Sequence, residues 1–300
     1  RKKQIGKSYA SYNRKRRKMH EDKTRRLTRE DRTRGSFLSK QLSPEVRDFD
    51  PRIAYQYFSF LDAATLENRA FFLDTSSLQG PRSDCSLFFA YHEMIPHFST
   101  KHRSHAERVL TTMEQSVERL AVILQRNNVY ITQGVIEELR QYVQIIRRLA
   151  DEAGNKIDER RIKRPVISLM NICERAYQEK PKGELLSTTV GQKMRAIIEG
   201  LEPPTGEVEP PSETDKDVVA TAVTSALINQ ERTRIISHDY GMALLMHRLS
   251  SFLSTNKFSG GHQRADGVKK KLDIDLYAIL LKPNGLVPKK EAHIWHDFYF

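Results

Sequence analysis

The chain has 300 residues, of which 38% are hydrophobic and 29% are charged, and its formal net charge is +12. Its length allows one large core or two modest ones. No apolar run approaches the length of a membrane-spanning helix, and the N-terminal segment lacks the apolar stretch of a secretory signal, so we expect no membrane partner. The two cysteines, Cys85 and Cys173, are too few and too far apart for a disulfide framework, which indicates an intracellular, reducing compartment.

Nearly all the excess charge lies in the first 35 residues, which hold 15 Lys or Arg against 4 Asp or Glu. A segment so basic and so poor in aliphatic residues cannot fold alone, so residues 1–45 are predicted to form an extended or partly helical arm. Its expected partner is RNA, because each neutralised phosphate releases counterions. A targeting signal is the alternative. The residues expected to bind RNA are basic and lie in two clusters: Arg14, Lys15, Arg16, Arg17, Lys18, Arg25 and Arg26.

Residues 46–300 are predicted to form one domain of alternating strands and helices, because apolar residues recur at periods of two or of three to four. The charged stretch 151–164 is expected to face solvent, and the proline-rich stretch 201–215 to be a loop. In the first half of this domain the expected elements are a helix at 51–61, a strand at 70–73, a helix at 109–124, a strand at 129–132 and a helix at 134–150. In the second half they are helical segments near 166–173 and 194–198, a helix at 218–228, a strand at 234–238, a helix at 242–253 and a last strand at 272–280.

Several acids stand at the ends of these elements. Asp74 directly follows the first strand and Asp239 the third, while Glu138 and Asp217 lie where helices begin. The simpler interpretation of Asp74 is a cap for the next turn, and that of Glu138 is a favourable interaction with the helix dipole. Asp215 shares its segment with Asp217, and periodicity does not choose between them.

The order of elements implies right-handed strand–helix–strand units in one parallel sheet with helices on both faces. The carboxyl ends of such strands share one rim, so all four acids could converge there. Carboxylates gathered without basic residues repel one another unless divalent cations bind among them. Oxygen-only ligation suits Mg²⁺ or Mn²⁺, and the usual chemistry of such a site is phosphodiester hydrolysis.

Four segments in order, LDTSSL, VIEEL, TDKDVVATA and IISHD, resemble the motifs of PIN-domain nucleases over about residues 70–285. The resemblance implies a three-layer α/β/α sandwich with a central parallel sheet and helical insertions. It also implies a metal-dependent endoribonuclease that uses one or two Mg²⁺ or Mn²⁺ ions. Residue by residue, the resemblance assigns the metal-site acids, in order, to Asp74, Glu138, Asp217 and Asp239, with Ser76 as a polar neighbour.

Some alternatives remain open at this point. A Thr214–Asp217 capping box would explain Asp217 without a metal. His238 could touch a phosphate or fill the rim. The histidines between 92 and 105, and the terminal pair His293 and His296, could bind zinc, although their spacing matches no usual zinc site. The basic arm favours a role in RNA processing or ribosome maturation. A non-catalytic assembly component of a ribonucleoprotein is the rival hypothesis.

Overall fold

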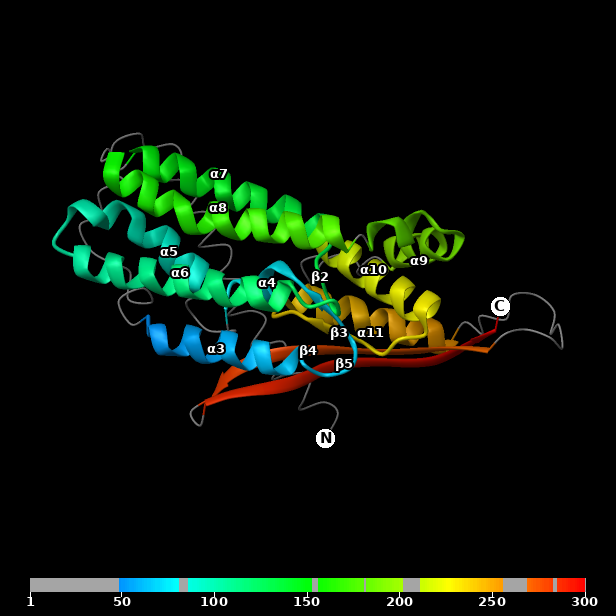
Figure 1. Ribbon diagram of the computed structural model, residues 1–300. Coiled ribbons are helices and arrows are strands. Elements are labelled where there is room, and N and C mark those ends of the chain that lie inside the picture. The colour runs from blue at the N-terminus through cyan, green and yellow to red at the C-terminus, as the bar shows by residue number, and fades with distance from the viewer. Residues whose placement is uncertain are drawn as a thin grey trace, which may run out of the picture. The chain divides into compact units, whose positions relative to one another are not determined.

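The computed structural model describes most of the chain after the predicted arm. The arm and its expected RNA-binding residues therefore lie outside the described residues, as do Cys85 and most of the proline-rich loop. What is described is an α/β structure with a five-stranded mixed sheet, compatible with a three-layer α/β/α arrangement (Figure 1). The described ranges are 49–80, 86–152, 156–180, 182–201, 211–255, 269–282 and 285–299.

The sheet has the strand order β2-β1-β3-β4-β5. The parallel strands are β1 (Ala70–Leu73), β2 (Val129–Tyr130), β3 (Thr233–Ile236) and β4 (Lys269–Lys282). The last strand, β5 (Gly285–Tyr299), pairs with β4 in the antiparallel direction. The predicted wholly parallel sheet is therefore wrong at this edge.

The β4–β5 hairpin is also longer than the sequence indicated, and β5 was not predicted at all. Pro288 and the charged residues from Lys289 to Glu291 interrupt the alternation that marks a strand. Proline is tolerated in β5 because it is an edge strand, where one side needs no ladder hydrogen bonds. The extended conformation of β5 is therefore determined by pairing with β4 and not by the local sequence pattern.

The predicted helices at 109–124, 134–150 and 242–253 are confirmed as parts of longer helices. Most residues of the charged stretch 151–164 whose side chains the structure describes face solvent as expected, but Asp158 and Ile162, in the helix that begins at Lys156, are buried. The helices are α3 (Pro51–Ala64), α4 (Thr75–Leu78), α5 (Leu87–Met94), α6 (Arg103–Leu124), α7 (Gln133–Glu152), α8 (Lys156–Glu179), α9 (Thr189–Gly200), α10 (Glu213–Asn229) and α11 (Tyr240–Thr255), with short 3-10 helices η1 (Ile95–Ser99) and η2 (Gly183–Ser187).

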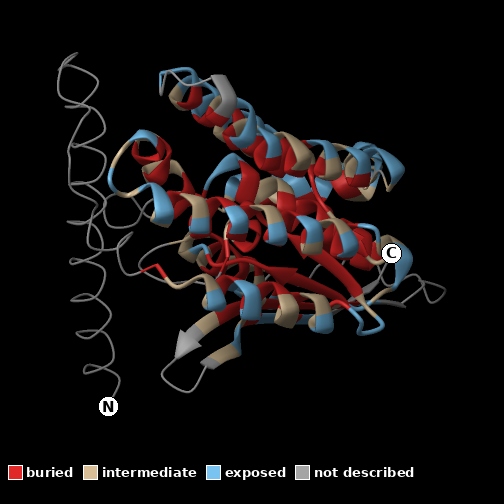
Figure 2. Cartoon of the chain, turned by 60° about the vertical axis from the view of Figure 1, so that its left-hand side comes forward, coloured by how far each residue is buried: buried red, intermediate tan, exposed pale blue. Residues whose placement is uncertain are grey.

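The small-residue helix α10 occupies the centre of the domain. It packs against β3 and β4 and also against α7, α9 and α11. With neighbours on several sides, it buries nearly all its residues from Val218 to Leu227 (Figure 2). Ala, Thr, Ser and Val suit this position, because short side chains let the flanking elements approach closely. The acids at the start of α10 are thereby held against the sheet.

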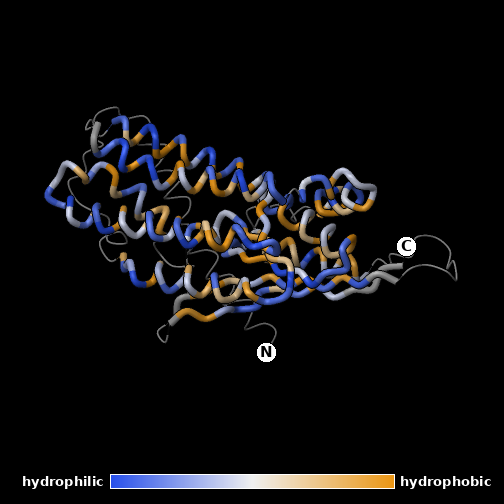
Figure 3. Tube along the Cα trace, viewed as in Figure 1, coloured by the Kyte–Doolittle hydropathy of each residue, from blue (hydrophilic) through white to orange (hydrophobic). Residues whose placement is uncertain are grey.

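Helices α5 to α8 pack against one another, and in addition α6 packs against α3 and α7 against α10 (Figure 1). Along α7, buried positions recur from Val135 to Ala150 at three- and four-residue steps, and its colour alternates accordingly (Figure 3). No helix in the described ranges is both long enough and apolar enough to span a membrane.

Candidate functional site at the carboxyl rim of the sheet

Asp74 lies where β1 ends, and its carboxylate is held by two serines. Asp74 is only 4% exposed. Ser76 donates from its backbone N–H at 3.3 Å and from its hydroxyl at 2.6 Å to Asp74 Oδ2. The Ser237 hydroxyl donates to the same oxygen at 2.9 Å. Asp74 therefore does cap α4, as its simpler interpretation predicted, and it is also oriented by a hydroxyl that follows another strand.

The loop after β3 is tied to the turn after β1. The His238 N–H donates to Ser76 Oγ at 2.8 Å, and the Ser76 and Ser237 hydroxyls lie 3.2 Å apart. Ser237 Oγ accepts the Asp239 N–H at 3.0 Å, and the Gly241 N–H donates to Asp239 Oδ1 at 2.6 Å. A chain of hydrogen bonds thus fixes the exposed Asp239 relative to the buried end of β1.

Asp215 lies in the first turn of α10 and forms a capping box with Ser212. The Ser212 N–H donates to Asp215 Oδ2 at 2.8 Å, and the Asp215 N–H donates to Ser212 Oγ at 3.0 Å. A Cβ added at Gly241 would lie 3.2 Å both from Asp215 Oδ2 and from Asp239 Oδ1. Both carboxylates therefore approach Gly241 so closely that a side chain at this position would crowd them.

Asp217 points toward a different element. Its Oδ2 accepts the Gly134 N–H, in the first turn of α7, at 2.9 Å. The capping box that the sequence suggested for Thr214 and Asp217 is wrong, since the box is formed by Ser212 and Asp215. Asp217 thus joins α10 to the N-terminus of α7, where a negative charge is favourable.

The pKa values show which acids share one electrostatic environment. Burial raises the pKa of Asp74, the charges of Glu138 and Asp239 raise it further, and the two serines partly offset the rise. Burial, followed by the charges of Asp239 and Asp74, raises the pKa of Asp215 to about 7. No Lys or Arg is among the main influences on either group. We call Asp74, Glu138, Asp215 and Asp239 the rim acids, because they repel one another at this end of the sheet.

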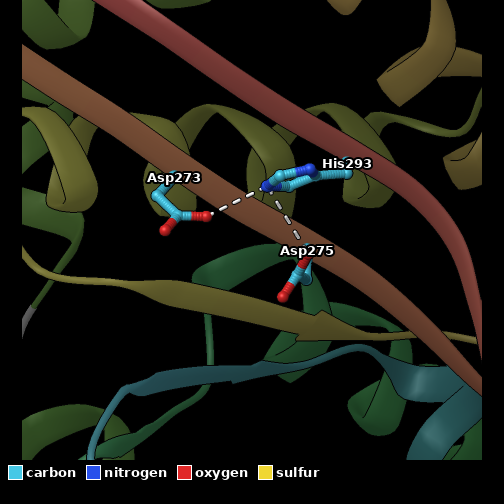
Figure 4. Close-up of side chains that lie close together, drawn as sticks. All are labelled: Asp273, Asp275 and His293. Carbon is cyan, nitrogen blue, oxygen red and sulfur yellow. Dashed lines mark hydrogen bonds and ion pairs between the residues drawn. The ribbon is translucent and has the colours of Figure 1, made fainter.

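The rim acids do not form a closed metal cage. Among the described residues, only Asp273, Asp275 and His293 bring three potential ligand atoms within 4.8 Å of one another. That group is therefore close enough to bind a metal ion (Figure 4). The histidines from 92 to 105 take part in no such group of the described residues. His293 was among the histidines weighed for zinc, whereas Asp273 and Asp275 carried no signal beyond their alternation along a strand.

Basic side chains already surround Asp275 in the group of Asp273, Asp275 and His293. Asp275 lies 2.5 Å from Lys290 Nζ, 3.1 Å from Arg69 Nη1 and 3.7 Å from Arg234 Nη2. Burial alone would raise the pKa of Asp275, but Lys290, His293 and Arg234 together lower it. A metal ion would have to displace a lysine beside two arginines. The charge balance therefore favours an ion-pair network over a bound metal ion at Asp275.

Tyr57 of α3 contacts two residues that lie close to the rim acids in the chain, Ser77 and His238. Its hydroxyl donates to the Ser77 carbonyl at 2.8 Å and lies 2.8 Å from His238 Nε2. We expect Tyr57→Phe to lower the free energy of unfolding by about 1–3 kcal/mol, because buried polar groups lose a hydrogen-bond partner. Urea denaturation measures this loss, with Tyr55→Phe as the control since Tyr55 is 51% exposed. Equal losses in the two variants would contradict a specific role for the Tyr57 hydroxyl.

Sequence reasoning named the acids and Ser76 but missed the other residues that hold them. Ser237 and Gly241 flank Asp239 at two residues' distance, and a serine before an acid at a strand end was the available signal. Tyr57 had none, because only the tertiary fold brings α3 against His238.

The comparisons with known proteins add no family to this description. No protein-family model, no curated protein and no solved structure matches the chain.

Proposed function

We propose that the chain is a metal-dependent endoribonuclease with a PIN-like fold, acting in RNA processing or ribosome maturation. The observation that carries the proposal is the set of rim acids. Asp74 is buried, its neighbours Glu138, Asp215 and Asp239 repel it, and burial together with other carboxylates raises the pKa of Asp215 to about 7. Folding such a set together costs stability, and a divalent cation would offset that cost.

The donor set fits Mg²⁺ or Mn²⁺, because every rim acid offers carboxylate oxygen and two of them, Asp215 and Asp239, approach the same residue, Gly241. Hydrogen bonds from the described protein to Asp74 all end on Oδ2, so Oδ1 is its oxygen available to an ion. Asp239 would offer Oδ2, since Gly241 holds Oδ1. When bound there, one or two divalent ions would activate water and neutralise charge on the scissile phosphate.

The remaining residues position this set. Ser76 and Ser237 orient the Asp74 carboxylate, and the capping box fixes Asp215 at the start of α10. We assign Asp217, which the PIN resemblance makes a metal-site acid, to holding α7 against α10 through Gly134. We assign Asp215 in its place beside Asp74 and Asp239, because its carboxylate approaches Gly241 as that of Asp239 does and is repelled by both acids.

RNA is the proposed substrate because of the arm, whose 15 basic residues among the first 35 suit a polyanion. A non-catalytic RNA-binding or assembly component of a ribonucleoprotein is the second candidate. One observation favours it: no three rim acids bring their oxygens within 4.8 Å of one another.

Metal removal separates the two candidates. We expect the full chain to cut an end-labelled single-stranded RNA internally in Mn²⁺ or Mg²⁺, to stop cutting in EDTA, and to resume when Mn²⁺ is restored. Denaturing gels read the products, and a filter-binding assay in the same buffers measures RNA binding. RNA that is bound but intact with every metal would overturn the nuclease proposal in favour of the assembly component.

A further inference from the structure

The β4–β5 hairpin has one buried face and one polar face. Cross-strand pairs place Asp273 opposite Trp295 and Asp275 opposite His293. Their side chains share one face, because paired residues in a ladder point the same way. Figure 4 shows Asp273, Asp275 and His293 together on that side. The alternate residues of both strands are buried in the core: Leu272, Ile274, Leu276, Ala292 and Ile294.

Trp295 is the most unusual residue of the polar face. It is 55% exposed, and it is the only tryptophan of the chain. The Lys271 ammonium lies 5.3 Å from the centre of its ring. A tryptophan left in water beside a cation offers both a stacking surface for a base and a charge for a phosphate.

Cations outnumber acids around this tryptophan. The acids of the face are engaged in ion pairs: Asp273 with Arg232 and His293, and Asp275 with Lys290. These pairs order the cationic side chains without cancelling their total charge. Among the residues of this face whose side chains the structure describes, the basic members are Arg69, Arg232, Arg234, Lys271 and Lys290, against the acids Glu67, Asp273 and Asp275.

Trp295 lies toward the end of the sheet opposite to Asp74 and Asp239. Its partner Asp273 precedes Ile274, which pairs with Thr233 at the start of β3, whereas Asp74 and Asp239 follow the carboxyl ends of β1 and β3. Lys290 is opposite Tyr277 and so lies level with Ile236, the last residue of β3. The length of β3 therefore separates Trp295 from Asp74 and Asp239 by on the order of 13 Å. A strand bound on this face would therefore be held outside the reacting phosphate.

We propose that the polar face of the β4–β5 hairpin binds single-stranded RNA, with a base stacked on Trp295 and phosphates held by Lys271, Arg232 and Lys290. This inference rests on the proposed function for its choice of RNA, since it supplies the surface that holds the substrate beside the cut. Charge complementarity and the exposed indole favour RNA over a protein partner.

The single tryptophan makes the proposal directly measurable in the full chain. Its fluorescence reports on this face alone, whatever the basic arm binds. We expect a single-stranded RNA oligonucleotide to quench the emission and to shield it from iodide. Heparin, a polyanion without bases, should do neither. Quenching by heparin equal to that by RNA would overturn the stacking proposal.

Substitutions give the second measurement. Trp295→Ala should weaken RNA binding about 10-fold in an anisotropy assay with labelled RNA, and Trp295→Phe should restore most of it, because stacking is worth about a factor of ten or more per base. Lys271→Glu should weaken both binding and quenching, while Lys193→Glu on α9, an equally exposed lysine, should change neither.

The outcomes separate this inference from the nuclease proposal. RNA that binds without changing the tryptophan emission, or a Trp295→Ala chain that binds at full affinity, would overturn the RNA-binding face even if cleavage is observed. Quenching with the expected order of variants would support it even if no metal promotes cleavage. Emission that responds to a protein partner and stays unchanged with RNA would also overturn it.

Discussion

Asp74→Asn is expected to reduce metal-dependent RNA cleavage by on the order of 100-fold or more, with RNA binding unchanged. The substitution keeps the size of the side chain and its bonds with Ser76 and Ser237, but it removes the buried charge that a divalent ion would meet. Losing one anionic ligand costs several kcal/mol of transition-state stabilisation, and each 1.36 kcal/mol is a factor of ten in rate. Single-turnover cleavage at saturating RNA and Mn²⁺ measures the effect.

The matched control is Asp273→Asn, on the polar face of the hairpin. This substitution removes an aspartate from the other group of potential metal ligands. We expect its cleavage rate at saturating RNA to stay within about twofold of that of the unsubstituted chain. A residue remote from the reacting phosphate leaves the activation barrier of cleavage unchanged. A collapse of cleavage in Asp273→Asn with full activity in Asp74→Asn would move the metal site from the rim to Asp273, Asp275 and His293.

Asp215→Asn is expected to stabilise the metal-free protein at pH 8 by roughly 2–4 kcal/mol. Burial and the charges of Asp239 and Asp74 raise the pKa of Asp215 to about 7 from an ordinary 3.8. Between these values the folded chain binds more protons than the unfolded chain, so stability falls as pH rises from about 4 to 7, and the penalty is complete above 7. Asparagine can still accept the Ser212 N–H, so the capping box survives.

Urea denaturation in EDTA at pH 4, 6 and 8 measures this prediction. The gain of Asp215→Asn over the original chain should be near zero at pH 4 and largest at pH 8. Adding Mn²⁺ at pH 8 should stabilise the original chain more than the variant, since the ion meets one carboxylate fewer. Parallel pH curves for the two chains would contradict a strained carboxylate at Asp215, and Asp217→Asn serves as the control because its partner is Gly134.

Local pattern predicted much of the scaffold because the elements around the rim are buried in regular ways. The strand before Asp74 and the strand before His238 are fully buried, and the apolar run from Ala70 to Leu73 and the pair Ile235 and Ile236 mark them in the sequence. Long amphipathic helices such as α6 and α7 can be predicted from their apolar stripe. Acids that directly follow these elements could therefore be named from the sequence.

Other features depended on partners distant in the chain. The strand β5 contains Pro288 and a charged run, and it exists because β4 supplies its hydrogen bonds. Ser212 bonds the carboxylate of Asp215, and Gly134, in a separate helix, bonds that of Asp217, so the two acids have different surroundings. Spacing along one helix cannot anticipate that difference.

By itself, the sequence determined that this protein is an α/β chain with a basic arm, buried strands and acids at their carboxyl ends, because periodicity, burial and charge are local properties. Tertiary structure alone decided that the sheet is mixed, that the Asp74 carboxylate is held by serines from two strand ends, and that Trp295 lies exposed among cations. The physical reason is that hydrogen bonds and charge–charge interactions between remote segments depend on distance in space, which separation along the chain does not encode.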